Sequence, residues 1–211
     1  MSLRKSLLAF LSSGPSSGYD LAREFSETVG GFWYASHSQI YPELRRLEGQ
    51  GLVRSDADVH DGRLRKRVYH LTDDGWAAVR EWLESPPAFS PERDLAGLQI
   101  LLADVLSIDA IRSILGHYRD HYELRRQVWQ AQLDQLRAGT HPRLAMRRAT
   151  LPDVDGELMT GLKEFVLVGQ VERSELELMW ADRLVAWLDE VEPRRHGDVA
   201  AGVAPTGSSP P

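Results

Sequence analysis

Polar side chains that could contact a nucleic acid gather along one amphipathic segment, residues 36–53 (SHSQIYPELRRLEGQGLV). Ile40, Leu44 and Leu47 follow helical spacing and are expected to form its buried face. Glutamine can bond two groups on adenine, arginine can bond two acceptors on guanine, and hydroxyls can bond phosphate. We therefore expect a helix that contacts DNA through these residues: Ser36, Ser38, Gln39, Tyr41, Pro42, Arg45 and Arg46.

A proline inside this segment indicates where the helix begins. Pro42 has no amide N–H, a loss that costs little in the first turn, where the N–H groups have no helical partner. We therefore expect the helix to start at Ser36 or Ser38. The polar residues then lie at its N-terminal end, where free N–H groups and the helix dipole attract phosphate.

A cluster of cations follows in residues 62–67 (GRLRKR). After Gly51, apolar residues alternate with polar ones on both sides of a tight-turn signal at Asp61 and Gly62, which predicts a β-hairpin. Its cations could each neutralise a phosphate, so that binding to DNA would weaken as salt is added. The cations expected to contact DNA from this hairpin are Arg63, Arg65, Lys66 and Arg67.

Both features also have simpler explanations, because a polar helix face is usually only solvated and a basic strand often protects a sheet edge. The net charge of −6 and the pI of about 5.7 also argue against DNA binding. The acidity lies mostly in residues 86–211, with 14 Lys and Arg against 19 Asp and Glu, whereas residues 1–85 hold 11 against 12. The order of the two features favours DNA binding, because a helix face that is only solvated would not require a basic hairpin directly after it.

The elements around these residues predict a winged helix-turn-helix domain. Helices are expected over residues 3–11 and 19–29, the latter capped by Ser17, and again after the hairpin, where Thr72 can cap a fourth helix. In this arrangement the third helix enters the major groove and the hairpin tip meets the DNA backbone.

Three stretches resemble the PadR-type transcriptional regulators: GYDLAREF, FWYASHSQIYPELRRLEGQGLV and RKRVYHLTDDGWAAVREWL. The resemblance covers about residues 5–84, and its Ile-Tyr-Pro-x-Leu core is specific. It implies DNA binding, with Tyr19, Ser38, Gln39, Tyr41 and Arg45 at recognition positions and Arg65, Lys66 and Arg67 on the wing. Past Pro87, the length and two long helices are similar to the larger subfamily with phenolic-acid repressors and a virulence-gene activator. The wing departs from the pattern, since HDG leads straight into RLRKR where relatives often have Gly-Arg-Pro or Gly-Pro.

The proline-rich stretch 85–91 (SPPAFSP) divides the chain. We expect a DNA-binding domain over residues 1–85, a helical dimerisation and effector domain over 90–192, and a disordered tail over 193–211, which is poor in large apolar residues. A helix beginning near Pro91 is expected to turn a set of apolar residues inward: Leu95, Leu98, Leu102 and Val105.

Two long helices are expected in the second half, over residues 108–136 and 154–191, joined by a loop or broken helix. A helix of this length exposes an apolar stripe that a small domain cannot cover by itself, which favours an antiparallel helical homodimer. A self-contained three-helix bundle in a monomer is the alternative. The residues expected at the dimer interface are Ile111, Leu115, Tyr118, Tyr122, Trp129, Leu158, Leu162 and Phe165.

Two further clusters have residue types that could bind a ligand. His117 and His121 could share a metal, but a third ligand is missing, so we expect no metal. Trp33, Tyr118 and Trp129 could line a pocket for a small aromatic or hydrophobic effector, although aromatic residues at helical spacing more often form a core.

The chain lacks cysteine, a glycine-rich phosphate loop and a G-x-S-x-G elbow, so neither an enzyme nor a cofactor is expected. No stretch approaches the ~18 apolar residues of a membrane span, and a cytoplasmic protein is expected. The sequence therefore predicts a mainly α, homodimeric, sequence-specific transcriptional regulator. Repression is favoured because blocking a promoter requires only occupancy. The alternatives are an activator of the same fold and a winged-helix module that binds proteins, which the acidic charge would suit.

Overall fold

The computed structural model describes the backbone of residues 3–27, 37–60, 63–87 and 94–201. Side chains are described for these residues except 24–27, 37–38, 57–60, 63–66 and 194–201. The chain divides into two compact units, and each is described by itself. Unit 1 comprises residues 1–91 and 134–164, and unit 2 comprises residues 92–133 and 165–211.

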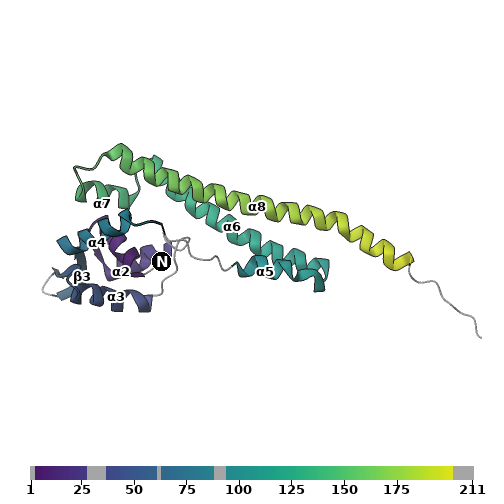
Figure 1. The fold of residues 1–211 in the computed structure, drawn as a ribbon, viewed down its shortest axis with the longest axis horizontal. Coiled ribbons are helices and arrows are strands. Elements are labelled where there is room, and N and C mark those ends of the chain that lie inside the picture. The colour runs from purple at the N-terminus through teal and green to yellow at the C-terminus, as the bar shows by residue number, and fades with distance from the viewer. Residues whose placement is uncertain (1–2, 28–36, 61–62, 88–93, 202–211) are drawn as a thin grey trace, which may run out of the picture. The chain divides into compact units, whose positions relative to one another are not determined.

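Unit 1 contains the expected order of three helices, a hairpin and a fourth helix, together with a short strand and a further helix that were not expected (Figure 1). Its elements are α1 (Leu3–Leu11), β1 (Ser16–Ser17), α2 (Gly18–Glu27), α3 (His37–Gly49), β2 (Val53–His60), β3 (Arg63–Leu71), α4 (Asp73–Glu84) and α7 (Pro142–Thr150). The strands form an antiparallel sheet in the order β1-β3-β2. Val53 pairs with Leu71 and His60 with Arg63, so β2 and β3 form the expected hairpin.

The core of unit 1 is formed by the apolar faces that helical spacing predicts. Ile40, Leu44 and Leu47 are each 0% exposed, which confirms the buried face of α3. Leu7 of α1 and Leu21 of α2 are likewise 0% exposed and belong to the same cluster. These contacts fix α3 with its opposite face toward solvent.

Side-chain caps fix the starts of two helices, as expected. The Ser17 hydroxyl accepts a hydrogen bond from the Asp20 amide at 3.1 Å and donates one to the Asp20 carboxylate at 2.6 Å. The Thr72 hydroxyl accepts from the Gly75 amide at 3.1 Å and donates to the Gly51 carbonyl at 2.6 Å. The second cap therefore ties the start of α4 to the turn that follows α3.

Unit 1 also contains residues 134–164, which were expected in the second domain. The expected loop contains a helix, α7, which packs on the turn between α1 and β1. Arg147 Nη1 donates to the Ser12 carbonyl at 3.1 Å and to the Ser12 hydroxyl at 2.9 Å. Arg143 Nη1 donates to the Phe10 carbonyl at 3.2 Å, and Leu144 is 1% exposed. Gly14, at φ +141°, gives the turn a conformation that other residues rarely adopt.

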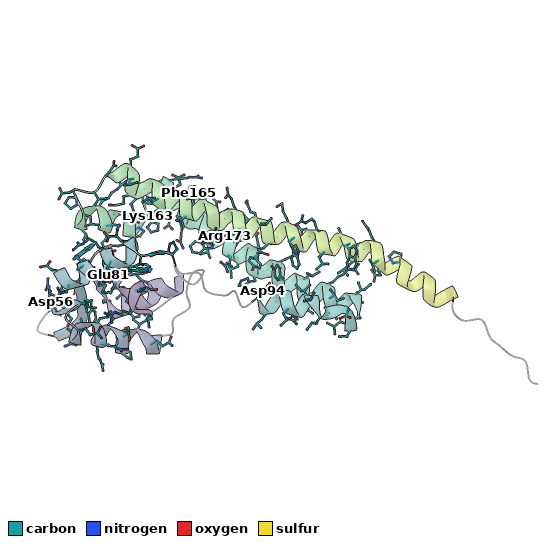
Figure 2. All side chains as sticks on the ribbon, in the orientation of Figure 1. Asp56, Glu81, Asp94, Lys163, Phe165 and Arg173 are labelled. Atoms are coloured by element: carbon teal, nitrogen blue, oxygen red, sulfur yellow. The ribbon has the colours of Figure 1, made fainter. Side chains whose placement is uncertain are left out.

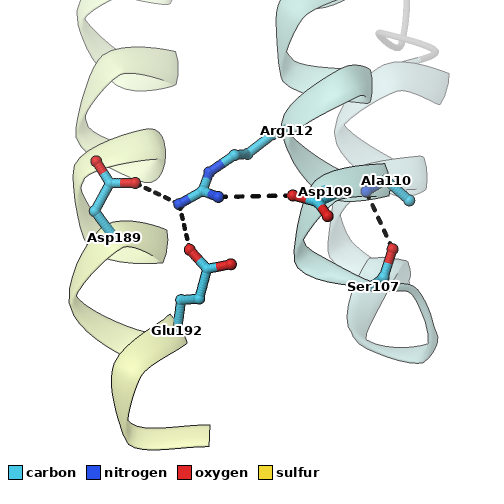
Figure 3. A network of polar contacts seen from close by, with 6 residues as sticks. All are labelled: Ser107, Asp109, Ala110, Arg112, Asp189 and Glu192. Atoms are coloured by element: carbon cyan, nitrogen blue, oxygen red, sulfur yellow. Dashed lines mark hydrogen bonds and ion pairs between the residues drawn. The ribbon is translucent and has the colours of Figure 1, made fainter. Parts of the chain in front are cut away.

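Unit 2 is built around two long antiparallel helices. Its elements are α5 (Leu95–Leu101), a 3₁₀ turn η1 (Ala103–Val105), most of α6 (Ile108–Arg137) and most of α8 (Gly156–Ala201). Arg112 of α6 donates to Asp189 and Glu192 of α8 at 2.5 and 2.8 Å (Figure 3). Arg119 of α6 pairs with Asp182 of α8 at 3.1 Å. This pair lies later in α6 and earlier in α8 than the Arg112–Asp189 pair, as expected for antiparallel helices.

Two expectations about the second half differ from the structure. Leu95, Leu98, Leu102 and Val105 were expected to point inward, but within the single chain they are 74, 50, 61 and 83% exposed. The helix α5 contains no buried residue, and its half-buried Ile100 packs against the core cluster of Ile108, Leu115 and Leu188, so the apolar residues on its other sides face solvent. The helix α8 also continues through Pro193 to Ala201, into the stretch that was expected to be disordered. Arginine and alanine in that stretch favour a helix despite the proline.

Candidate nucleic-acid interface

The solvent-facing side of α3 carries most of the polar residues that were expected to contact DNA. Gln39, Pro42, Arg45 and Arg46 are exposed, and Tyr41 is 41% exposed. These side chains are presented together because the opposite face of α3 is buried in the core of unit 1. Ser36 lies outside the described residues, and Ser38 is described only as part of the α3 backbone.

The start of α3 at His37 lies between the two predicted starts, but Pro42 does not lie in the first turn, where it was expected. Pro42 is the sixth residue of the helix, beyond the first turn, so its missing N–H would have bonded within the helix. The helix therefore loses one backbone hydrogen bond at Pro42. The N-terminal position of the polar residues is unaffected.

A glycine lets α2 approach the polar face of α3 closely. A Cβ atom on Gly18 would lie 2.7 Å from Cε1 of Tyr41 and 3.4 Å from Cδ1 of Leu44. The Tyr41 ring therefore lies directly on the backbone at the start of α2. Tyr19, the next residue, is 56% exposed. The contact brings two tyrosines to the same edge of the unit.

A cavity of about 310 Å³ joins α2, α3 and β3 at this edge. It brings together four residues that were expected to contact DNA: Tyr19, Tyr41, Arg45 and Arg67. Three lining residues were not expected there: Ser17, Gly18 and Tyr69. Two arginines and two tyrosines around one opening can hold a phosphate through charge and hydroxyl groups. The close packing of Gly18 is the reason that residues from α2 and α3 share this cavity.

A glutamate that sequence reasoning missed ties the base of the hairpin to α3. Glu48 of α3 accepts a hydrogen bond from the Ser55 hydroxyl of β2 at 2.5 Å and pairs with Arg67 of β3 at 3.6 Å. Arg67 is 57% exposed, so its guanidinium also faces solvent. A second acid, Asp56 (labelled in Figure 2), pairs with Arg54 at 2.6 Å. Glutamate at position 48 looked like an ordinary exposed helix residue, and nothing local indicated its partners.

The remaining cations of the hairpin are placed by their backbone alone. Arg63, Arg65 and Lys66 lie in β3, with Arg63 opposite His60 and Lys66 opposite Asp58. The register shifts between Asp58 and Val59, where a bulge interrupts the ladder. The backbone thus places all three cations in the first half of β3.

The residues expected at a dimer interface fall into two groups in the structure. Leu115 and Trp129 of α6 are 0 and 2% exposed, so they are buried within their own chain and are not available to a partner. Ile111, Tyr118 and Tyr122 are half-buried. The exposed residues are on α8, where Leu158, Leu162 and Phe165 are 58, 62 and 82% exposed.

Of the residues expected to bind an effector, only Tyr118 lines a cavity of unit 2 that the structure describes. Its hydroxyl donates to Glu177 at 2.6 Å, and burial together with this bond raises the pKa of Tyr118 above its ordinary value. The phenol is therefore neutral at physiological pH. Trp129 is buried, and Trp33 lies outside the described residues.

The two histidines once weighed as metal ligands have other contacts. His117 Nδ1 lies 2.8 Å from the Ser113 carbonyl, and the His121 ring packs edge-on against Tyr122. Within the described residues, no group of three or more potential ligands is placed to hold a metal ion. No helix in the same part of the chain combines the length and apolar character that crossing a membrane requires.

Comparison with known proteins identifies relatives along nearly the whole chain. Residues 7–81 match the model of the transcriptional regulator PadR-like family. A probable transcriptional regulator of Mycobacterium tuberculosis, Rv1176c, is 31% identical over 192 residues, which cover 90% of this chain and 99% of that protein. The negative transcriptional regulator PadR of Bacillus subtilis is 29% identical over 189 residues, covering 89% and 98% of the two chains.

Solved structures give the same result for the fold. Bacillus subtilis PadR in complex with operator DNA matches with a TM-score of 0.70 at 26% identity, covering 88% of this chain and 97% of that one. The same protein in complex with p-coumaric acid matches with a TM-score of 0.63 at 26% identity, covering 89% and 95%. The Vibrio cholerae virulence activator AphA matches with a TM-score of 0.61 at 27% identity, covering 90% and 99%.

These matches extend over both halves of the chain and agree with the winged helix-turn-helix fold of unit 1 and the long helices that follow. The proteins they identify are transcriptional regulators and not enzymes. The chain belongs to the PadR-like family of transcriptional regulators.

Proposed function

We propose that this regulator is a homodimeric repressor that binds operator DNA through α3 and the β2–β3 hairpin and leaves it when a small aromatic effector binds. One observation carries the proposal. The polar face of α3 is exposed beside the cavity formed by Tyr19, Tyr41, Arg45 and Arg67, in a chain that resembles operator-bound PadR.

On this proposal the exposed residues of α3 divide between bases and phosphates. Gln39, Arg45 and Arg46 lie on the face that would enter the major groove, where amide and guanidinium groups can bond base edges. Tyr19, Tyr41 and Arg67 surround the edge of that face and would hold the DNA backbone. The hairpin cations Arg63, Arg65 and Lys66 would follow the adjoining phosphates, together with Ser38 and Pro42 of α3. Ser36, which precedes α3 in the sequence, stays a predicted contact.

The second copy in the dimer would cover the apolar residues that one chain leaves exposed. The helix α5 has no buried residue, and α8 exposes Phe165, Met179 and Trp187 at 82, 55 and 54%. Large apolar side chains exposed along a helix are often covered by a partner. We therefore assign dimer contacts to α5 and to the exposed side of α8, together with Leu158 and Leu162, while Leu115 and Trp129 support the packing of α6 inside each chain. Two copies would contact half-sites about 34 Å apart.

Repression is the favoured sign because occupancy of a promoter is enough to block it, and the matched Bacillus subtilis PadR is described as a negative regulator. The complex of that protein with p-coumaric acid supports an aromatic effector. Action on DNA places the protein in the cytoplasm.

Salt-dependent DNA binding tests the proposal. The assay is a gel shift on the promoter of the protein's own operon at rising salt, comparing the wild type with Arg45→Ala and with the double variant Arg65→Ala/Arg67→Ala. Arg45→Ala should weaken specific binding by about 1–3 kcal/mol. The wing variant should weaken binding to all sequences and reduce the salt slope by about two.

An exposed arginine of α4 provides the control. Arg80 lies outside the cavity and outside α3, so Arg80→Ala should leave both affinity and salt slope unchanged. Full affinity in both Arg45→Ala and the wing variant would contradict DNA binding through this face. Binding to a protein that persists in high salt and in excess DNA would instead support a protein-interaction module.

A further inference from the structure

The contact between α7 and the turn after α1 is closest at a methionine. A Cβ atom on Gly14 would overlap Cγ of Met146 and lie 2.6 Å from its Sδ. Gly14 is buried and has a φ of +141°, a conformation in which a side chain would be strained even without this neighbour. The thioether of Met146 therefore packs directly on the backbone of the turn that leads into β1 and α2.

The same sulfur contacts an arginine that holds the turn. Arg143 Nη1 lies 3.8 Å from Met146 Sδ and donates to the Phe10 carbonyl at 3.2 Å. Its Nη2 lies 3.5 Å from the Ser16 hydroxyl. A thioether is only a weak acceptor, so the sulfur does not compete with the oxygen atoms for this guanidinium. The arrangement thus depends on a weakly polar sulfur at position 146.

Met146 is also accessible to solvent. The chain has no cysteine and four methionines, so oxidation of its sulfur atoms means oxidation of thioethers. Met146, Met159 and Met179 are 37, 5 and 55% exposed, and Met1 lies outside the described residues. Met146 therefore combines access for a small oxidant with a packing contact inside unit 1, whereas Met159 is protected.

Hydrogen peroxide can transfer an oxygen atom to Met146 Sδ. The O–O bond breaks and an S–O bond forms; the sulfur loses two electrons, and the peroxide is reduced to water. The product is a sulfoxide, whose oxygen is polar and accepts hydrogen bonds strongly. The turn leaves no room for this oxygen on the side of Gly14. The oxygen must face solvent or accept from Arg143, and either position disturbs the contact of α7 with the turn.

The turn leads directly into the segment that positions the tyrosines of the candidate interface. Ser16 pairs with Tyr69 of β3, and Gly18 lies against Tyr41 of α3. We propose that Met146 is a modification site, at which hydrogen peroxide forms a sulfoxide that loosens α7 from the turn and weakens DNA binding. The effect on DNA rests on the proposed function, whereas the loss of packing does not.

The test compares two full-length variants that both carry Met179→Leu, because Met179 lies on the side of α8 assigned to the dimer and its oxidation would also act there. The reference is Met179→Leu, and the test variant is Met146→Leu/Met179→Leu, in which leucine conserves the apolar volume. After treatment with peroxide, the DNA affinity of the reference should fall by about three- to tenfold in anisotropy titrations, and that of the test variant should stay unchanged. Peptide mass spectrometry should find the added oxygen on Met146 before Met159.

Unfolding in urea gives a second readout that needs no DNA. Peroxide should lower the urea midpoint of the reference and leave that of the test variant unchanged. Methionine sulfoxide reductases for the two epimers should restore both midpoint and affinity in the oxidised reference. Met146→Gln/Met179→Leu, which places a polar side chain at position 146, should show the lower midpoint without peroxide.

Equal losses of affinity and midpoint in the reference and the test variant would overturn the inference, as would oxidation of Met159 before Met146. Unchanged affinity and midpoint in the oxidised reference would also overturn it and leave the proposed DNA binding in place. Absence of DNA binding in both untreated chains would contradict the proposed function. A fall of the midpoint confined to the oxidised reference would then still support the modification site.

Discussion

Replacing Gly18 by alanine tests the packing on which the candidate interface depends. The new Cβ would lie 2.7 Å from Cε1 of Tyr41 and 3.1 Å from Cδ1, where carbon atoms in contact are about 3.5–4.0 Å apart. The backbone of Gly18 is not in the left-handed region, so the restriction is one of space and not of conformation. Either α2 or the Tyr41 ring must move by nearly 1 Å.

Two effects on stability oppose each other. Overpacking costs about 1–3 kcal/mol, whereas glycine to alanine at a compatible backbone stabilises by about 0.4–1 kcal/mol through the unfolded state. Because Tyr41 is 41% exposed, its ring can swing toward solvent, and we expect a net loss near the low end, about 1 kcal/mol. The same swing removes Tyr41 from its place beside Arg45, so DNA affinity should fall more clearly, by about tenfold, or 1.4 kcal/mol.

The measurement combines urea unfolding with fluorescence anisotropy on labelled operator DNA at fixed salt. Gly49→Ala is the control, since Gly49 ends α3, the helix that carries Tyr41, and a Cβ there meets nothing within 4 Å. It should leave affinity unchanged and stability equal or higher. In a Tyr41→Ala background, Gly18→Ala should cost neither stability nor affinity. Wild-type affinity in Gly18→Ala, or simple additivity in the double variant, would refute the assigned contact.

Three further predictions concern unit 1. Arg147→Met should lower the free energy of unfolding by about 1.5–3 kcal/mol, because it removes two hydrogen bonds from a charged group to Ser12, whereas Arg148→Met, which loses one exposed bond to Thr160, should change it by under about 1 kcal/mol in urea melts. Burial, and secondarily Lys163, lower the pKa of His141 in the folded chain. The free energy of unfolding should therefore be highest above the pKa of an unfolded histidine and should fall as pH drops below it, because the unfolded chain then binds the proton more readily. Thermal melts from pH 8 to 5 should show this fall, and His141→Gln should make it smaller. Glu48→Gln should raise DNA affinity by about two- to fivefold in anisotropy titrations, because it releases Arg67 from a carboxylate near the DNA. The same change should lower the free energy of unfolding by under about 1 kcal/mol. An unchanged affinity would show that Arg67 does not face the phosphates.

Sequence reasoning was most successful where a local period determines the structure. The helical spacing of Ile40, Leu44 and Leu47 predicted the buried face of α3, and alternation beyond Gly51 predicted the hairpin. Hydroxyl caps at Ser17 and Thr72 were predicted because a cap needs only a side chain three residues before an amide. Each of these features is determined by residues that lie close together in the sequence, within a single helix or hairpin.

The unpredicted features depend on contacts between distant segments. The helix α7 carries the signals of a short helix, with Pro142 in its first turn and Arg147 in its last, but its stability comes from packing on the α1–β1 turn. The strand β1 is two residues long and exists because Ser16 and Ser17 pair with β3. The leucines of α5 have the spacing of a buried face, and the pattern does not distinguish a partner in the same chain from one in another copy.

The position of the tyrosines in the candidate interface follows from three constraints on one short segment. Ser16 pairs with Tyr69 of β3 and its hydroxyl lies 3.5 Å from Arg143 of α7, while Gly18, two residues later, lies against Tyr41 of α3. A shift of this segment away from any one partner would therefore strain its contact with the other two. Because packed interiors transmit small displacements instead of absorbing them, the placement of Tyr19 and Tyr41 is a property of the sheet, α3 and α7 together. Arg143, although 125 positions from Gly18 in the sequence, therefore helps to hold the segment that positions the interface tyrosines.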